Sequence, residues 1–302
     1  MSVITTSNHP KAYWPGVKAW WGRQYDEHPV EYTMLFDEDT STMSREEIVE
    51  LTGFGLASQK DQGASVSYDT ETQGVTNTAI HIAYGLGYIV TREEMDDNLY
   101  PIVGKRRAQA NAFSMRQTKE TVAANVYNRA FNSSYTFGDG KEILATDHPT
   151  ANGTQSNELT VAADLSEASL EDATIQIMNT LNSRGLKINV MPRKLIVPPA
   201  LFYEAHRILD TNLQVGTANN DLNILKSQGI FPEGVMVNHY LTDTDAWFIR
   251  TNAPQGMLCF NRVPIEFTQD KDFDTDNAKA KSYERYSFTI GDWRALFGSP
   301  GA

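Results

Sequence analysis

Cysteine is almost absent from this chain of 302 residues, in which Cys259 is the only one. A single thiol cannot form an internal disulfide. Cys259 lies in the apolar run from Met257 to Phe260, a setting typical of a buried structural cysteine and not of a reactive nucleophile. We therefore expect neither an internal disulfide nor thiol chemistry.

Long hydrophobic runs are also missing. No segment approaches the roughly 18 to 20 consecutive apolar residues that span a membrane, although 40% of all residues are hydrophobic. Residues 1–10 have neither a basic n-region nor an apolar core, so they do not resemble a secretory signal. The sequence predicts a soluble protein with no membrane partner.

The sequence contains no cluster of basic residues. It has 26 lysines and arginines against 38 acidic residues, which gives a formal net charge of −12. Surfaces that bind duplex DNA need clustered cations to contact phosphates, so sequence-specific nucleic acid binding is not expected. An acidic surface still suits a protein that encloses nucleic acid, because like charges prevent adhesion.

Motifs for catalysis and for cofactors are missing as well. Asp147 and His148 are the most enzyme-like pair, but adjacent residues in a loop before Pro149 do not face one substrate, and no nucleophile motif accompanies them. A turn is the expected structure there. Gly85 and Gly87 lack the third glycine of a dinucleotide-binding fingerprint. We expect no catalytic residues and no cofactor.

A metal site is not expected either. No two of the six histidines have the i, i+3 or i, i+4 spacing of a helical metal site. The acidic run from Asp270 to Asp276 begins like a calcium-binding loop, but Thr275 stands where that loop needs glycine and Lys281 where it needs glutamate. We interpret this run as a solvated acidic loop without a specific ion.

The clearest positive signal is a long helix from Thr91 to about Asn132. Thr91 and Glu94 form a capping box at its start. From Lys105 to Phe131 there is no proline or glycine, and these roughly 27 residues would extend ~40 Å. A compact globule of this size has a radius of gyration of ~19 Å, so the subunit is predicted to be flat or elongated. A long surface helix of a large enzyme is the alternative.

Residues 1–54 are rich in aromatic side chains but are interrupted by proline and glycine. The tryptophans of this segment are Trp14, Trp20 and Trp21. Such a segment forms either an arm that lies on another subunit or a first subdomain with its own aromatic core. Its one regular element is predicted to be a short amphipathic helix from Ser44 to Leu51, because Ser44 and Glu47 form a second capping box.

A long β-hairpin is predicted from Ser58 to Val90. Apolar residues alternate from Val66 to Tyr68 and again from Ile80 to Tyr88, with a turn at residues 69–74 between them. Few residues of the outer half can cover a core, and an isolated two-stranded hairpin is marginal in water. We expect another subunit to hold this hairpin, with a mobile flap as the alternative.

The rest of the chain alternates helix and strand signals, as expected for helices packed on a sheet. Ser169 is predicted to cap a helix that ends before Gly185, residues 195–197 to form a short strand, and residues 201–209 to form an amphipathic helix. Further strands are predicted near residues 247–250, 257–260, 265–267 and 283–290.

Several short motifs follow one another at a specific spacing. They are Gly53 to Ala57, Gln62 to Ala64 before Tyr68 and Asp69, Tyr84 to Gly87 leading into Thr91 to Glu94, Asp97 to Tyr100, Asp139 and Gly140 leading to Thr146 to Pro149, Leu195 to Pro199, and Gly216 to Asn223. In this order they cover most of the chain, which resembles tailed-bacteriophage major capsid proteins of the Hong Kong 97-type fold.

The resemblance implies an α+β subunit with four parts. Residues 1–54 would be an N-terminal arm, residues 55–90 the extended loop that reaches a neighbour, residues 91–163 with 246–302 the peripheral domain with its spine helix, and residues 164–245 the axial domain. Some members of the family crosslink through a loop lysine. Lys60 is the only lysine of this loop and lies at its base, which argues against crosslinking here.

From this resemblance we expect a major capsid protein of a tailed double-stranded DNA bacteriophage, which self-assembles into the hexamers and pentamers of an icosahedral head. Its other partners would be portal and scaffold proteins, a decoration protein, and packaged DNA without sequence-specific contacts. Its place would be the virion, after assembly in the bacterial host cytoplasm.

Two other functions remain open at this stage. One is an encapsulin-like bacterial nanocompartment shell protein, and the other is a soluble α/β hydrolytic enzyme that uses Asp147 and His148. For the shell protein, aromatic anchors dominate interface energetics. We therefore expect inter-subunit contacts at the aromatic residues Trp14, Trp20, Trp21, Tyr68 and Tyr84.

Overall fold

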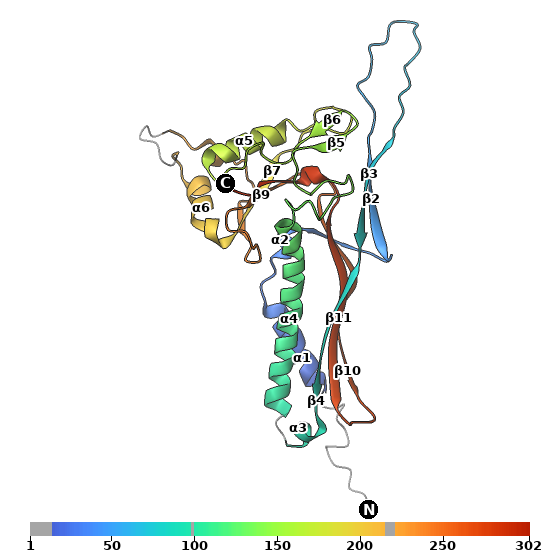
Figure 1. Ribbon diagram of the computed structural model, residues 1–302, viewed down its shortest axis with the longest axis vertical. Helices are drawn as coiled ribbons and strands as arrows, with labels where there is room; N and C mark the ends of the chain where they lie inside the picture. The colour runs from blue at the N-terminus through green and yellow to red at the C-terminus, as the bar shows by residue number, and fades with distance from the viewer. Residues whose placement is uncertain (1–13, 98–99, 215–220) are drawn as a thin grey trace, which may run out of the picture.

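The computed structural model describes residues 14–97, 100–214 and 221–302, except for the side chains of residues 14–17, 95–96 and 100–103. The described chain forms two four-stranded sheets and two small two-stranded ones. One large sheet runs along a long helix in an elongated lower half, and the other lies in an α/β block above it (Figure 1). An extended loop projects beside that block. The subunit is therefore elongated, as the sequence predicts.

The elongated half is built on a sheet with the strand order β1, β10, β11, β4. These strands are β1 (Asp37–Thr40), β10 (Met257–Lys271), β11 (Ala278–Ile290) and β4 (Ile82–Val90). Side chains of β11 alternate between buried and exposed from Ala278 to Glu284, because one face of the sheet is covered by helices and the other is open. The sequence signals near residues 257–267 belong to one long strand, β10.

The long helix is confirmed, with a break near its start. Helix α3 (Arg92–Asp96) precedes α4 (Tyr100–Asn128), which has 29 residues and would extend ~44 Å. The Glu94 N–H donates to Thr91 Oγ1 over 3.4 Å, which is the predicted cap. Pro101 stands in the first turn of α4, where a helix tolerates its missing N–H.

The N-terminal segment is more regular than the sequence analysis predicted. It contains α1 (Trp14–Glu27) and α2 (Tyr32–Leu35), and α1 packs along α4. Apolar and aromatic side chains of α1 meet α4 and the sheet in one hydrophobic cluster, which includes Trp21, Ala112 and Phe267. The aromatic residues on the buried face of α1 therefore pack within the subunit, in a core shared with α4 and the sheet and not in a first subdomain with its own core.

The α/β block is organised around a sheet with the order β12, β9, β7, β8. These strands are β12 (Leu296–Ser299), β9 (Trp247–Thr251), β7 (Pro192–Val197) and β8 (Val235–Val237). Its helices are α5 (Glu167–Met178), η3 (Pro199–Leu201), α6 (Phe202–Asp210) and α7 (Ile224–Ser227). Because β9 and β12 complete this sheet, the block takes in parts of residues 246–302 that the sequence boundaries place in the other domain.

The start of α5 differs from the prediction, whereas its end before Gly185 is confirmed. Ser166 is the N-cap, and its hydroxyl accepts from the Ser169 N–H over 3.1 Å. Ser169 is the third helical residue and returns the bond to the Ser166 N–H, so it forms the other half of a capping box. The helix ends at Met178, well before Gly185, because a polar turn follows.

The extended loop has different strands from those predicted. Residues 45–51 form a strand, β2 (Arg45–Leu51), and not the helix expected from Ser44 to Leu51. Strand β2 pairs antiparallel with β3 (Gln73–Ile80), whereas β4 leaves the loop and pairs with β11. The capping box of Ser44 and Glu47 favours a helix only locally, and the pairing of β2 with β3 outweighs this preference. Residues 52–72 have no regular strand, so the hairpin predicted from Ser58 to Val90 is wrong in its pairing.

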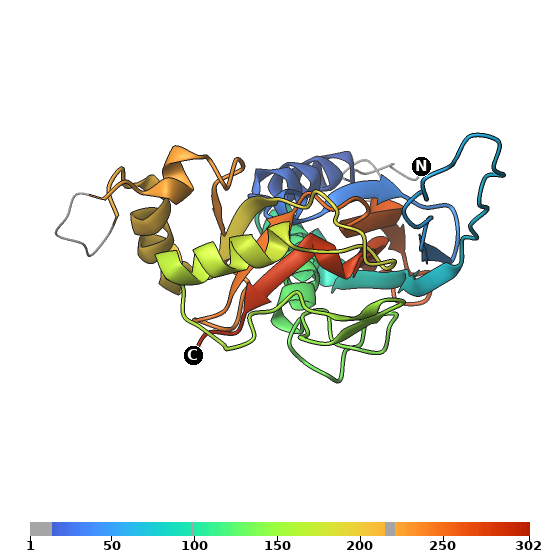
Figure 2. The same cartoon turned by 90° about the horizontal axis from the view of Figure 1, so that it is seen from above.

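Short elements complete the fold: β5 (His148–Thr150), β6 (Gly153–Gln155) and η4 (Trp293–Ala295). Three clusters of buried residues form the core, one below the extended loop, one in the α/β block and one between α1, α4 and the lower sheet. Seen from above, α6 and the extended loop lie at opposite ends of the molecule (Figure 2). In the described part of the chain, no helix has the length and apolar character that crossing a membrane requires.

Candidate assembly surfaces

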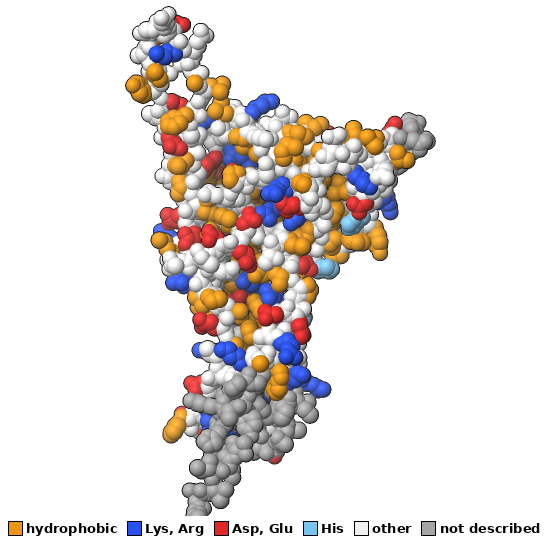
Figure 3. All heavy atoms as spheres, turned by 180° about the vertical axis from the view of Figure 1, so that it is seen from behind, with side chains coloured by type: hydrophobic (Ala, Val, Ile, Leu, Met, Phe, Trp, Pro, Cys, Tyr) orange, Lys and Arg blue, Asp and Glu red, His pale blue; other side chains and the backbone are white. Residues whose placement is uncertain are grey.

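The tip of the extended loop, residues 52–72, exposes apolar side chains that no part of its own subunit covers. Leu56 is 85% exposed and Tyr68 is 96% exposed, and Phe54 and Val66 are also exposed. Figure 3 shows this loop as a narrow projection with hydrophobic side chains among polar ones. Burying such side chains against another surface is worth about 1.5–3 kcal/mol each. The loop tip is therefore suited to contact with another molecule.

Few bonds hold the two sides of the loop tip together. Thr52 and Thr72 exchange backbone and hydroxyl hydrogen bonds, and the Thr52 N–H donates to the Thr72 carbonyl over 3.0 Å. Further out, the Gly55 N–H donates to the Asp69 carboxylate over 2.7 Å. A loop with so few internal bonds depends on its base and on external contacts for its direction.

The base of the loop is tied to the α/β block by a polar latch. Arg294, which is buried, donates from Nη1 to the Glu50 carboxylate over 3.2 Å and from Nε to the Leu181 carbonyl over 3.0 Å. The Ser183 hydroxyl also donates to Glu50. Since Glu50 belongs to β2, these contacts hold one strand of the loop against the block.

A second, exposed ion pair braces the loop further out. Arg184 Nη2 lies 2.5 Å from the Asp69 carboxylate. The Arg184 guanidinium, helped by the N–H groups of Gly55 and Thr70, lowers the pKa of Asp69 to about 2. Neither the latch nor this ion pair can be predicted from the sequence, because Glu50 and Arg294 are 244 positions apart and Asp69 and Arg184 are 115 apart.

Trp21 is buried within its own subunit, which corrects its assignment as an inter-subunit contact. It is 5% exposed, its ring stacks on Tyr25 and Phe267 at 5.2 Å, and its Nε1–H donates to the Asn111 side chain over 2.8 Å. Trp20 is half-buried at the edge of the same cluster, with Lys105 Nζ 6.0 Å from its ring. The side chain of Trp14 lies outside the described residues.

The two predicted contact tyrosines differ in their surroundings. Tyr68 is at the loop tip and contacts almost nothing of its own subunit. Tyr84 is on β4, where its ring stacks on Tyr286 at 4.7 Å, so most of its packing is internal. Trp20, Tyr68 and Tyr84 are not brought together by the fold, and only Tyr68 is freely available.

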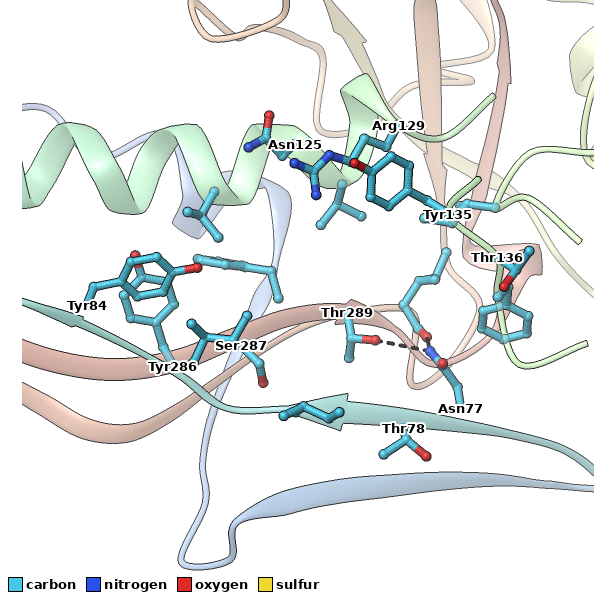
Figure 4. A pocket seen from close by; sticks show the side chains of 18 residues that line it. Asn77, Thr78, Tyr84, Asn125, Arg129, Tyr135, Thr136, Tyr286, Ser287 and Thr289 are labelled. Atoms are coloured by element: carbon cyan, nitrogen blue, oxygen red, sulfur yellow. Dashed lines mark hydrogen bonds between the residues drawn. The ribbon is translucent and has the colours of Figure 1, made fainter. Parts of the chain in front are cut away.

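A hollow of about 410 Å³ lies between α4, β3, β4 and β11, just below the loop base. Figure 4 shows the Asn77 side chain pointing toward Thr289, to which Nδ2 donates over 3.0 Å. Arg129 lies over the Tyr135 ring at 4.3 Å on the helix side of the hollow. The side chains that line this hollow include no aspartate, glutamate, histidine or cysteine.

Charged groups are buried between α4 and the sheet. Lys119 Nζ lies 3.7 Å from the Glu284 carboxylate, and both side chains are buried. Burial raises the pKa of Glu284, although Lys119 and Arg116 oppose the change. Burial likewise raises the pKa of Glu120, whose oxygens accept the backbone N–H groups that begin α2. These groups fix how α1 and α2 dock on α4.

The enzyme-like pair does not form a catalytic dyad. His148 is fully buried, stacks on Trp293 at 4.5 Å and bonds to the Asp139 carboxylate over 2.6 Å. Asp147 points elsewhere, to Lys141 Nζ at 2.5 Å. The two side chains therefore make separate contacts, and the His148 ring is enclosed within the subunit.

The acidic run from Asp270 to Asp276 begins at the end of β10 and continues through the turn to β11. Lysines hold two of its carboxylates, with Lys279 Nζ 2.5 Å from Asp272 and Lys271 Nζ 2.5 Å from Asp276. Across the described residues, no group of three or more histidine, cysteine or acidic side chains is placed to hold a metal ion. Burial raises the pKa of the Cys259 thiol to about 12, in keeping with an unreactive cysteine.

Comparison with protein families gives one clear match. The family model described as phage capsid protein matches residues 76–298, which is most of the chain. No curated protein sequence matches the chain.

Solved structures share the fold at low sequence identity. The capsid of cyanophage P-SCSP1u has a TM-score of 0.61 at 9% identity, over 89% of this chain and 86% of that one. The capsid of a native GTA particle has a TM-score of 0.57 at 11% identity, over 90% of each chain. A virus-like particle from Pyrococcus furiosus has a TM-score of 0.53 at 10% identity, over 95% of this chain and 99% of that one.

Proposed function

Since this chain belongs to the phage capsid protein family, we propose that it self-assembles into the hexamers and pentamers of an icosahedral head that encloses double-stranded DNA. Its α+β fold is the Hong Kong 97-type capsid fold, and its role is that of a major capsid protein, a structural component of the virion. The arrangement of copies and the packaged DNA are the parts of the proposal that go beyond the family and the fold.

The observation that carries this proposal is the exposed apolar tip of the extended loop. Residues 52–72 reach away from their own core and expose Phe54, Leu56, Val66 and Tyr68. A soluble monomer gains nothing from such a projection, whereas a neighbouring copy can bury it. Every copy in a closed shell makes the same contact, so one loop per subunit is sufficient.

The formal net charge of −12 supports the enclosure of DNA without tight binding. Phosphate contacts need clustered cations, and many of the lysines and arginines on the described surface are paired with acids. We therefore propose that DNA meets this shell without sequence-specific contacts. Portal and scaffold proteins, with a decoration protein, are the other proposed partners, and assembly takes place in the host cytoplasm.

The proposal excludes an enzymatic role for Asp147 and His148, since the His148 ring is enclosed and bonded to other groups. A bacterial compartment shell would share the fold but not the family match, which is to phage capsid proteins. The family match therefore favours the phage head over the compartment shell.

Electron microscopy of assembly products at low concentration tests the proposed arrangement. Class averages of capsomers should show rings with sixfold and fivefold symmetry, because an icosahedral head needs both. Purified particles that contain only dimers or open filaments would contradict the proposal. A nuclease-protection assay on particles from infected cells tests the second part, and particles that hold protein cargo but no DNA would favour the compartment shell.

A further inference from the structure

The turn between β10 and β11 carries one exposed aromatic ring, and ion pairs stabilise this turn. Phe273 is 95% exposed at the tip of this turn. Two ion pairs and a backbone bond from the Asp272 N–H to the Asn277 carbonyl over 2.9 Å hold the turn on both sides of it. Single exposed apolar residues are common, so the exposure of Phe273 alone does not indicate a contact surface, and its surroundings have to be considered.

A hollow of about 870 Å³ lies on the open face of the same sheet. Gly87, Lys281 and Thr268 form one row across it, because Lys281 pairs in register with each of the other two. Gly87 has no side chain, which leaves the floor of the hollow clear. Ile89, which is 55% exposed, and Tyr283 stand on either side of that row and give the hollow apolar walls.

The turn and the hollow carry complementary unpaired charges. Asp274, next to Phe273, forms no ion pair with any described residue, and neither does Lys281 in the hollow. Both side chains are exposed. Glu266 and Asp270 line the β10 side of the hollow and repel an acidic side chain there. An acidic side chain would therefore approach Lys281 from the β4 side of the hollow, where Gly87 lies.

We propose that Phe273 of one copy packs into this hollow on a second copy of the chain, between Ile89 and Tyr283 and over Gly87, while Asp274 pairs with Lys281. Burial of the ring contributes about 1.5–3 kcal/mol, and Lys281 can also face the ring as a cation. This contact rests on the proposed self-assembly and adds a specific place for it.

The hollow of the same subunit begins beside the turn, because Ile89 and Asp270 both pair with Lys279, and it extends to Tyr283, ~17 Å beyond Ala278 at ~3.3 Å per residue. Phe273 is 95% exposed, so it does not fill the hollow of its own subunit. The proposed contact is therefore made with a second copy. Phe273 and the hollow are different surfaces at the same end of the molecule, so a contact between them is heterologous. Heterologous contacts close into a ring when the rotation between copies permits it. The contact would thus join copies around a shared axis at the lower end of the subunit (Figure 1).

Disulfide trapping in assembled particles tests this contact. Phe273→Cys with Tyr283→Cys should yield covalent multimers on a non-reducing gel after mild oxidation, because a disulfide forms only where the Cα atoms are within ~7 Å. Native Cys259 is buried and does not compete. The matched control is Phe273→Cys with Tyr203→Cys, which places the second thiol on exposed α6 and should give no multimers. Particles that form normally but give no 273–283 crosslink would overturn the contact and leave self-assembly intact.

Charge exchange provides an independent test. Asp274→Lys and Lys281→Asp should each raise the subunit concentration needed for assembly, by about two- to fivefold per contact, while the melting temperature of the subunit stays unchanged. The double variant should restore assembly, because the pair is rebuilt with opposite sense. A double variant as impaired as the weaker single variant would contradict the pairing. If the wild-type chain forms no particles under any condition, the proposed function fails, and this contact fails with it.

Discussion

Trp20 and Trp21 are adjacent in α1, but only Trp21 is fully surrounded by its own subunit. Its ring joins α1 to α4 and to β10 through stacking and through the bond to Asn111. Trp20 keeps one side open, so it stays a proposed contact with a neighbouring subunit. The exposed fraction of each ring, which the sequence does not reveal, indicates that Trp21 contributes to folding and that Trp20 is available for assembly.

Truncation of the two rings should therefore have different effects. Trp21→Ala should lower the free energy of unfolding by about 3–5 kcal/mol, since it opens a cavity in a packed cluster. Trp20→Ala should cost much less stability and should reduce assembly instead. Urea denaturation of dissociated subunits and sedimentation of assembled ones measure the two effects. Equal destabilisation by both variants would show that Trp20 belongs to the core as well.

The buried pair of Lys119 and Glu284 makes subunit stability depend on pH. Because burial raises the pKa of Glu284 in the folded state, the folded protein holds this proton more tightly than the unfolded chain does. The free energy of unfolding should fall as the pH rises from ~4.3, the ordinary glutamate value, through the raised pKa. Glu120, whose pKa burial also raises, contributes to the same trend.

Substitutions at this pair test that assignment. Glu284→Gln should reduce the pH dependence of the melting temperature, because it removes the titrating carboxyl group. Lys119→Met should cost about 3–5 kcal/mol at neutral pH, because it leaves a buried carboxylate without its cation. Melting curves of dissociated subunits from pH 4 to pH 8 provide the readout. An unchanged pH profile in Glu284→Gln would assign the dependence to other groups.

Among the elements, the extended loop gains its direction from the latch between Glu50 and Arg294. Strand β2 has exposed and half-buried residues in alternation and no buried face of its own. Without the latch, its pairing with β3 would be a two-stranded ribbon fixed at one end only. The latch thus connects the loop, which is suited to contact a neighbour, with the α/β block that completes the subunit.

Breaking the latch should loosen the loop and destabilise the subunit. Arg294→Met should lower the free energy of unfolding by about 3–5 kcal/mol, because Arg294 is buried and also pairs with Asp292. Limited proteolysis within residues 52–72 should become faster. Arg45→Met is the matched control, since it removes an exposed ion pair from the same strand at a cost within about 0.5 kcal/mol. Equal proteolysis rates in both variants would contradict the latch.

Local signals explain which elements could be predicted from the sequence. The start of the long helix at Thr91 and the strand at residues 195–197 follow from caps, periodicity and flanking prolines, and the structure confirms both. Strand β2 cannot be predicted in this way, because its partner β3 begins 22 residues later and the Ser44 capping box favours a helix locally. Residue patterns within a short window contain no information about such pairings.

For the candidate contact residues as well, some properties can be predicted from the sequence and others follow only from the fold. Aromatic composition pointed to Trp21 as an interface residue, but its partner Phe267 is 246 positions away, and only the fold shows that the two rings stack. The sequence does not indicate Phe54 and Leu56 as contact residues, because they lie in an irregular segment without periodicity. Their importance follows from exposure on a projecting loop, which is a property of the folded chain.

For the whole molecule, shape and surface together describe a shell subunit. The long helix and lower sheet form an elongated body, with the loop tip at one end and the turn between β10 and β11 at the other (Figure 1). The α/β block extends away from the loop (Figure 2). Contact surfaces at several ends of an elongated subunit allow each copy to touch several neighbours, which a closed shell requires.

The most direct test of this account is whether the loop tip is needed for shells but not for folding. Residues 54–71 are replaced by a short Gly/Ser turn, which keeps Thr52, Thr72 and the pairing of β2 with β3. A full-length control changes Phe54, Leu56, Val66 and Tyr68 to serine. Circular dichroism and melting of dissociated subunits report on folding, and sedimentation velocity with negative-stain microscopy reports on assembly.

The account predicts closed shells from the wild-type chain and none from the replaced loop, with the melting temperature of the subunit nearly unchanged. The serine variant should assemble poorly as well, because it removes the apolar side chains and leaves the loop length intact. Shells of normal size and stability from the variant without residues 54–71 would contradict the central claim that this loop joins neighbouring subunits.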